Sequence, residues 1–174
     1  MKRHLVSQLA VSLLCAACAR STDAVSPRSP MLERATSAAA ELDGLTPNFN
    51  LEVILRPVDG GDGFGHVKFR QANDDAKRID LGVWVRDLAP NTSYRLQRAV
   101  DGVVDGNCTS TGWLTLGEGT VPQDIVTDDR GTAKQDLFRV VMNPAGTAFD
   151  IHFQVVTTAG VPVLTSDCYQ YYVR

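Results

Sequence analysis

Apolar and polar side chains alternate along short stretches from Asn48 onward, and this alternation limits what the chain can fold into. Successive side chains of a strand point to opposite faces of a sheet, so a period of two is typical of strands with one buried face. The alternation is clearest in residues 49–55, 66–70, 79–86, 94–97 and 149–155, and a final stretch covers residues 166–174. Weaker strands are predicted at Trp113–Leu116 and Lys134–Val141. The pattern therefore predicts about eight strands.

Residues that favour tight turns separate these stretches. Glycine, asparagine and aspartate concentrate at residues 59–65, 101–107, 128–131 and 143–146. They are the residue types that β-turns need, and no stretch between the strands has the period of a helix. Short strands joined by tight turns predict an all-β fold, an antiparallel β-sandwich that forms one domain over residues 48–174.

The run DLAPNTSYRL at residues 87–96 resembles the corner of immunoglobulin-like and fibronectin type III sandwiches, where a Leu-x-Pro-x-Thr-x-Tyr pattern enters a strand. Leu88, Pro90, Thr92 and Tyr94 occupy that pattern. The resemblance implies an immunoglobulin-like sandwich in which the tyrosine packs inward and its hydroxyl bonds back to the main chain. About 80 residues follow Tyr94, more than a fibronectin domain has left, so the resemblance extends to the architecture and not to that topology.

A second run, TDDRGTA at residues 127–133, is similar to a sequence motif of a turn followed by a strand that is common in bacterial surface sandwiches. Together, the two resemblances imply a bacterial exported domain of the immunoglobulin-like or fibronectin type III kind. They imply no particular chemistry, because this sandwich architecture hosts many unrelated functions.

The first 18 residues have the pattern of a signal peptide. Lys2 and Arg3 supply a positive start, and a mostly apolar stretch follows from Leu5 to Cys18. That stretch is too short to span a bilayer, which needs about 20 apolar residues. A positive start, a short apolar stretch and small residues together indicate export.

Two cleavage sites fit the end of this signal. The run AAC at residues 16–18 resembles a bacterial lipobox, whose cysteine is acylated and becomes the first residue of the mature chain. The run departs from the lipobox at Cys15, where leucine is usual. The alternative is an A-x-A site, ACA at residues 17–19, which is cut before Arg20 and leaves a soluble secreted protein.

Residues 19–47 are predicted to form a tether. They are rich in serine, threonine, alanine and proline, a composition typical of linkers. Because an anchored domain needs such a spacer, we favour lipidation at Cys18. The expected location is the bacterial cell envelope, with the lipid anchor as the attachment to the membrane.

Charge and cysteine content narrow the function further. The chain has a net charge of −3 and no basic block, so nucleic acid is not expected as a partner. Cys108 and Cys168 are the cysteines that remain after the signal is removed. Because export favours oxidation, we predict that they pair in a disulfide, and two separate free thiols are the alternative.

Few residues are suited to catalysis. Outside the signal, the histidines are His66 and His152, each on the polar face of its predicted strand. Two histidines are too few for the metal centre of a copper-zinc superoxide dismutase, and the sequence has no G-x-S-x-G hydrolase elbow. The aspartate pairs at residues 74–75 and 128–129 are interpreted as turns, because neighbouring residues on a strand point to opposite faces. We expect no catalytic centre and no cofactor.

Binding residues are predicted on one loop and one strand face. Asp59 and Asp62 lie in a glycine-rich loop whose oxygens would suit calcium, although Asp-Gly is also the common hairpin turn. Trp84 lies on the face opposite its two valine neighbours. With Tyr169 and Tyr171 it would form an exposed aromatic surface for a carbohydrate or a protein, unless both faces of these strands are covered. The candidate binding residues are Asp59, Asp62 and Trp84.

These features favour a binding or structural module that presents a surface to an unknown protein or glycan at the cell surface. Two other classes stay open. A metal-assisted hydrolase would use His66 or His152, and it would require the two histidines and a carboxylate to converge in a pocket. A small-ligand carrier would need an internal apolar cavity.

Overall fold

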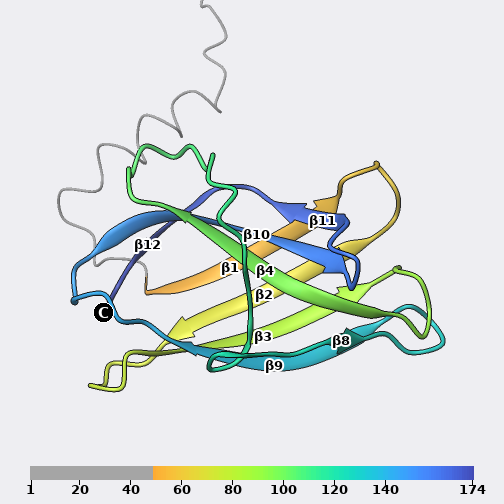
Figure 1. Cartoon of the computed structure of the whole chain (residues 1–174), viewed down its shortest axis with the longest axis horizontal. Helices are drawn as coiled ribbons and strands as arrows, with labels where there is room; N and C mark the ends of the chain where they lie inside the picture. The colour runs from red at the N-terminus through yellow and green to blue at the C-terminus, as the bar shows by residue number, and fades with distance from the viewer. Residues whose placement is uncertain (1–48) are drawn as a thin grey trace, which may run out of the picture. The chain divides into compact units, whose positions relative to one another are not determined.

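The computed structural model describes residues 49–174, and the regular elements in this range are all strands (Figure 1). The predicted signal peptide at residues 1–18, the tether at residues 19–47 and the lipidation site Cys18 lie outside the described residues. Within the described range, no helix has the length and apolar character needed to cross a membrane.

Eight of the described strands have four or more residues, in agreement with the predicted number. They are β1 (Asn50–Pro57), β2 (Phe64–Gln71), β3 (Arg78–Arg86), β4 (Ser93–Asp101), β9 (Ala133–Val140), β10 (Ala148–Thr157), β11 (Pro162–Ser166) and β12 (Tyr169–Tyr172). Strands of two residues lie between β4 and β9, and they are β5 (Leu114–Thr115), β6 (Gly117–Glu118), β7 (Val121–Pro122) and β8 (Ile125–Val126). The period-two alternation thus located the long strands other than β11 to within a few residues, whereas the strand predicted at Trp113–Leu116 is the two-residue β5.

The strands form one sheet that is nearly closed into a barrel (Figure 1). Hydrogen-bonded neighbours follow the order β5-β4-β10-β11-β1-β2-β3-β9-β6-β7, while β12 pairs with β10 and β8 with β4. The all-β prediction is confirmed, and the pairs between strands of four or more residues are antiparallel. The predicted sandwich has two sheets, whereas here the pairing continues from strand to strand around one core. A twisted sheet that curls in this way leaves fewer open edges.

The core is built from the inward face of each long strand. Val53, Val67 and Val83 are register partners across β1, β2 and β3, and all three are buried. Burying one such side chain contributes roughly 1.5–3 kcal/mol. Leu96 and Val155 continue the core on β4 and β10, where they are again direct partners. The apolar residues of the alternating pattern therefore form one continuous interior.

The corner before β4 has the local structure that its sequence resemblance implies. Tyr94 is 4% exposed, and its hydroxyl accepts a hydrogen bond from the Ala89 backbone N–H at 3.2 Å. The buried Thr127 hydroxyl donates to the Ala89 carbonyl oxygen at 2.7 Å. These bonds hold the turn at residues 87–92 against the start of β4.

The C-terminal stretch predicted at residues 166–174 contains β12, whereas β11, which lies before it, is not predicted by the alternation. β11 ends at Ser166, pairs with β1 and β10, and is followed by Asp167 and Cys168 before β12 begins. At the break, the Ser166 hydroxyl accepts a hydrogen bond from the Phe153 N–H at 2.9 Å. The Ser166 side chain thus replaces a backbone hydrogen-bond partner of Phe153. Beyond the break, β12 pairs with β10.

Residues 114–126, here called the bridging segment, connect the two ends of the sheet. β5 pairs with β4, and the Leu116 N–H donates to the Leu96 carbonyl oxygen at 2.9 Å. β6 runs parallel to β9, so the segment reaches from β4 to β9, two strands that do not pair with each other in the described structure. Gly117 is required in this segment, because a Cβ there would lie 1.9 Å from the Val121 carbonyl oxygen.

Candidate functional site

Side chains of β2, β3, β4, β9 and β10 line a cavity of about 410 Å³. The apolar side chains of its wall are Phe69, Ile79, Leu81, Val100, Leu116, Phe149, Ile151 and Phe153. The bridging segment contributes Leu116. No aspartate or glutamate among residues 49–174 lines the cavity. The interior thus offers an apolar volume without acidic groups.

The chain between β9 and β10 forms the opening of this cavity. Met142 lines the cavity and is also 88% exposed, so it lies where the cavity meets solvent. Val140 is likewise a lining residue with an exposed side chain. Asn143 and Thr147 add the polar atoms of this rim. A ligand could therefore enter without opening the strand pairs.

Two arginines from opposite ends of the sheet point into the same cavity. Arg98 lies on β4 opposite Phe153, and Arg139 lies on β9 opposite Ile79, so both occupy inward-facing positions. Burial lowers the pKa of Arg98, and the positive charge of Arg139 lowers that pKa further. An arginine nevertheless keeps its charge in proteins. The cavity therefore contains two guanidinium ions that repel each other.

Neither guanidinium is neutralised within the described structure. The ion pairs among residues 49–174 include neither Arg98 nor Arg139. Arg139 donates one hydrogen bond, at 2.9 Å, to the Gly119 carbonyl oxygen of the β6–β7 turn. That bond holds the side chain in place and leaves most of its N–H donors for another partner.

Sequence analysis missed both arginines, although a signal for them exists. Tyr94, Leu96, Arg98 and Val100 occupy successive inward positions of β4, so the arginine stands in phase with apolar residues. A charged residue at a core position is rare unless it is paired. An interruption of this kind in the alternation could have marked Arg98 as a candidate.

The predicted loop residues Asp59 and Asp62 are exposed between β1 and β2. The Asp59 carboxylate accepts a hydrogen bond from the Gly61 N–H at 3.0 Å, the geometry of an aspartate that stabilises its own turn. Among residues 49–174, no group of three or more histidine, cysteine, aspartate or glutamate side chains could hold a metal ion. The loop therefore has the geometry of a turn.

Trp84 lies on the outer face of β3 and is 38% exposed, as its position in the alternation predicts. Its ring meets the Phe64 ring edge-on with centroids 5.9 Å apart, and the Arg86 guanidinium lies 5.0 Å from the Phe64 centroid. We call Phe64, Trp84 and Arg86 the outer aromatic patch. Phe64 begins β2 directly after the glycine-rich loop, so the structure brings that loop and Trp84 close together.

The two C-terminal tyrosines do not extend this patch. Tyr171 is fully buried, packs against Phe69 and Phe149, and donates a hydrogen bond to the side-chain amide oxygen Oε1 of Gln71. Burial raises the pKa of its hydroxyl. Tyr169 is half-buried and accepts the Ile54 N–H at 3.1 Å. The expectation that both tyrosines form an exposed surface is wrong, because β12 packs over the core.

The structure does not bring the two histidines together. His66 lies on β2 and contacts Glu52, and hydrogen bonds from Arg70 and then from His66 lower the pKa of that carboxyl. His152 lies on β10, where its Nε2 is 3.0 Å from the Ser110 carbonyl oxygen and its ring lies against Trp113. In the sheet, β11 and β1 lie between these two strands. The convergence that a metal-assisted hydrolase would need is therefore missing from the described structure.

The adjacent aspartate pairs take part in turns, as predicted. Asp74 accepts the Ala76 N–H at 3.1 Å. Asp128 accepts the Thr132 N–H at 2.8 Å and the Arg130 N–H at 2.9 Å with one carboxylate oxygen. These two bonds, the one from Thr132 first, lower the pKa of the Asp128 carboxyl. Both pairs therefore shape the chain locally.

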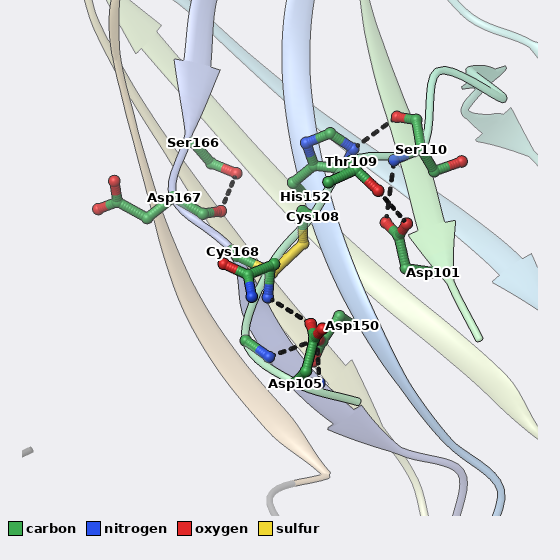
Figure 2. The surroundings of a disulfide bond; sticks show 12 residues. Asp101, Asp105, Cys108, Thr109, Ser110, Asp150, His152, Ser166, Asp167 and Cys168 are labelled. Atoms are coloured by element: carbon green, nitrogen blue, oxygen red, sulfur yellow. Dashed lines mark hydrogen bonds between the residues drawn. A yellow bond between two sulfur atoms is a disulfide. The ribbon is translucent and has the colours of Figure 1, made fainter. Parts of the chain in front are cut away.

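The predicted disulfide is confirmed. Cys108 and Cys168 are bonded, with their Cα atoms 5.4 Å apart, and the bond joins the chain after β4 to the break before β12 (Figure 2). Asp150, which is 0% exposed, accepts the Asp105 N–H at 2.9 Å and the Gly106 N–H at 2.7 Å. The disulfide and this carboxylate together hold residues 102–113 against the outer face of β10.

No model of a protein family matches the chain, and no curated protein matches it. The geometry of the described residues is therefore the basis for assigning a function.

Proposed function

We propose that this protein is an exported binding protein without a catalytic centre, and that a small, largely apolar ligand occupies its cavity. The observation that carries the proposal is the apolar cavity of about 410 Å³ with its exposed opening. Ligand pockets in proteins are apolar clefts or cavities of about 300–1,000 Å³. A barrel of about eight strands can enclose one small ligand. This favours the small-ligand carrier among the classes that the sequence leaves open.

Export to the bacterial cell envelope, with a lipid anchor at Cys18, is part of the proposal. The signal pattern of residues 1–18 and the composition of residues 19–47 support it. The Cys108–Cys168 bond supports it independently, because disulfides persist in oxidising compartments such as the periplasm and the cell surface. A ligand carrier tethered at the envelope would meet its ligand outside the cytoplasm.

We propose that the protein has no catalytic centre because of where its two described histidines lie. His66 is held by Glu52 on one strand, and His152 lies beside Trp113 on another. A general acid or base must reach the reacting group of a bound substrate. A ligand in the cavity would meet Arg98 and Arg139 and neither histidine.

We also propose a distant relationship to the immunoglobulin-like sandwiches. The buried Tyr94 and the bond from the Ala89 N–H to its hydroxyl support it, because this corner recurs in those domains. The relationship concerns architecture and carries no function.

A second candidate function rests on the outer aromatic patch. Phe64, Trp84 and Arg86 present rings and a charge beside the glycine-rich loop that contains Asp59 and Asp62. Aromatic and arginine side chains are enriched where proteins bind one another. We propose this surface as a contact for a protein or a glycan at the cell surface, independent of the cavity.

An uncharged fluorescent probe such as N-phenyl-1-naphthylamine tests the cavity. We expect one probe per protein, with an emission change typical of apolar surroundings. Val100→Trp, which fills part of the cavity, should weaken binding at least about tenfold, a loss of about 1.4 kcal/mol. Val121→Trp makes the same change at an exposed position outside the cavity and should leave the affinity unchanged. Thermal melting checks that both variants are folded, and no stoichiometric binding to the wild type would exclude the proposal.

A further inference from the structure

The charged side chains that line the cavity within residues 49–174 are all positive. Two of its residues, Arg98 and Arg139, are cations, and none of its lining residues within 49–174 is an anion. Charged side chains are rarely placed inside a protein unless a partner compensates the cost of removing them from water. Residues 49–174 offer no such partner, and a bound anionic ligand would supply the negative charge that this part of the chain lacks.

The two guanidinium groups approach this cavity from strands that do not pair. Arg98 comes from β4 and Arg139 from β9, and they are close enough for the charge of one to act on the other. The bond from Arg139 to the Gly119 carbonyl oxygen fixes one side of the pair. A guanidinium presents several N–H donors in a plane and binds carboxylate or phosphate through two parallel bonds. An anion between the two would therefore receive hydrogen bonds from both.

The rest of the wall requires a second chemical property of the ligand. Ile79 is the register partner of Arg139, Phe153 is the partner of Arg98, and Phe69 and Leu81 complete the apolar wall around them. A small inorganic anion would satisfy the arginines and leave this apolar surface in contact with water. An apolar chain attached to the anion would cover that surface and gain its burial energy.

We propose that the ligand is an amphipathic anion, with its acidic head between Arg98 and Arg139 and its hydrocarbon part against Phe69, Ile79, Leu81 and Phe153. The inference rests on the proposed function, because it names the chemical class of the ligand that enters the cavity. A carboxylate and a phosphate head share the required chemistry.

The test compares amphiphiles that have nearly the same hydrocarbon chain and different head groups. Dodecanoate, dodecyl phosphate, dodecanol and dodecyltrimethylammonium each displace N-phenyl-1-naphthylamine from the purified protein, at concentrations below those at which micelles form. We expect at least one of the two anions to bind at least about tenfold tighter than dodecanol, and the cation to bind most weakly. The preference should shrink as salt is added, because ions screen the attraction. The tighter anion identifies the head group.

Variants assign the preference to the two arginines. Arg98→Gln and Arg139→Gln should each lower the affinity for the anion relative to dodecanol by about tenfold, and Arg98→Lys should keep part of the preference. Arg95→Gln is the matched control, because Arg95 lies on the same strand, faces outward and pairs with Asp124 at 2.8 Å.

The possible outcomes distinguish failure of the inference from failure of the proposed function. Anion preference that disappears in the arginine variants and persists in Arg95→Gln supports the inference. Equal binding of the anions and dodecanol by the wild-type protein overturns the inference and leaves the proposed function standing. If the probe itself does not bind, the proposed function fails, and the inference fails with it. The comparison on the wild-type protein requires no variant to fold.

Discussion

Asp128 shows how one carboxylate can organise a turn. One of its oxygens accepts the N–H groups of Thr132 and Arg130, and its backbone carbonyl accepts the Gly131 N–H at 3.1 Å. Gly131 has a φ of +73° and lies so close to Leu88 that a Cβ would be 2.0 Å from the Leu88 carbonyl oxygen. The charged side chain thus fixes a turn that packs against the corner before β4.

The charge of Asp128 should make its contribution to stability depend on pH. Hydrogen bonds lower its pKa in the folded state, so the unfolded chain binds its proton more readily. The stabilisation is therefore complete above the ordinary aspartate pKa of about 3.9 and is lost as pH falls through the lower, folded-state pKa. We expect Asp128→Asn to melt below the wild type at pH 7, with a difference that shrinks toward pH 2.5.

The control for that experiment is Asp129→Asn, one residue further along the same turn. Its difference from the wild type should be small and should not follow the same pH dependence. Melting curves recorded by circular dichroism between pH 2.5 and pH 7 make the comparison. A constant difference between the wild type and Asp128→Asn across this range would contradict the role assigned to the charge.

Turns of this kind were predictable, whereas the arginines in the cavity were not. Asp128 bonds to residues two and four positions along the chain, so its role is already present in a short run of sequence. Arg98 and Arg139 are 41 residues apart in the sequence and meet through the curvature of the sheet. Alternation alone assigns a side chain to a face, but it does not say which other strand completes the site.

Residues 102–113 form a long connection that is held in place at several points. The disulfide fixes Cys108, and Asp150 accepts two backbone N–H groups from the same segment (Figure 2). Asp101, at the end of β4, accepts the Ser110 N–H at 3.2 Å. A connection without strands of its own thus gains its order from one covalent bond and several charge-assisted hydrogen bonds.

Reduction of the disulfide should destabilise the protein markedly. The cysteines are 60 residues apart, and the chain-entropy model gives about 4 kcal/mol for a loop of that size. We expect urea denaturation to show a loss of about 2–4 kcal/mol in the reduced protein. The double variant Cys108→Ser with Cys168→Ser is the control, and reductant should not change its stability. Equal stability of the oxidised and reduced wild type would contradict the assigned role.

The cysteine pair could be predicted from the sequence, but the break that it borders could not. Removal of the predicted signal would leave two cysteines and one pairing, so counting was sufficient. The separation of β11 from β12 depends on the Ser166 hydroxyl and its contact with the Phe153 N–H on another strand. The stretch predicted at residues 166–174 contains β12 and only the last residue of β11, so the alternation missed β11 as a strand.

Closure of the sheet determines where a ligand can bind. The long strands at the two ends of the sheet, β4 and β9, are joined by the bridging segment instead of by direct pairing. Arg98 and Arg139 lie on these two end strands and line one cavity. A fully paired barrel would place continuous backbone hydrogen bonds here, whereas this arrangement leaves room for side chains that need an external partner.

Two like charges in an apolar cavity should cost stability when no ligand is bound. Burial and the neighbouring Arg139 both disfavour the charged form of Arg98, as the lowered pKa indicates. Replacing Arg98 with methionine keeps an unbranched chain and removes the charge. We expect Arg98→Met to stabilise the ligand-free protein by about 0.5–2 kcal/mol in urea denaturation, and to abolish the preference for anionic amphiphiles.

Arg95→Met is the matched control for this last prediction. Arg95 lies on the outer face of the same strand and pairs with Asp124, so its replacement should change the free energy of unfolding by less than about 0.5 kcal/mol. A saturating concentration of the tighter-binding anion should reverse the order, because a ligand that binds the folded state more tightly in the wild type stabilises it more than Arg98→Met. A ligand-free Arg98→Met protein that is less stable than the wild type would show that the arginine stabilises the fold, and that a bound anion is not needed to explain its position.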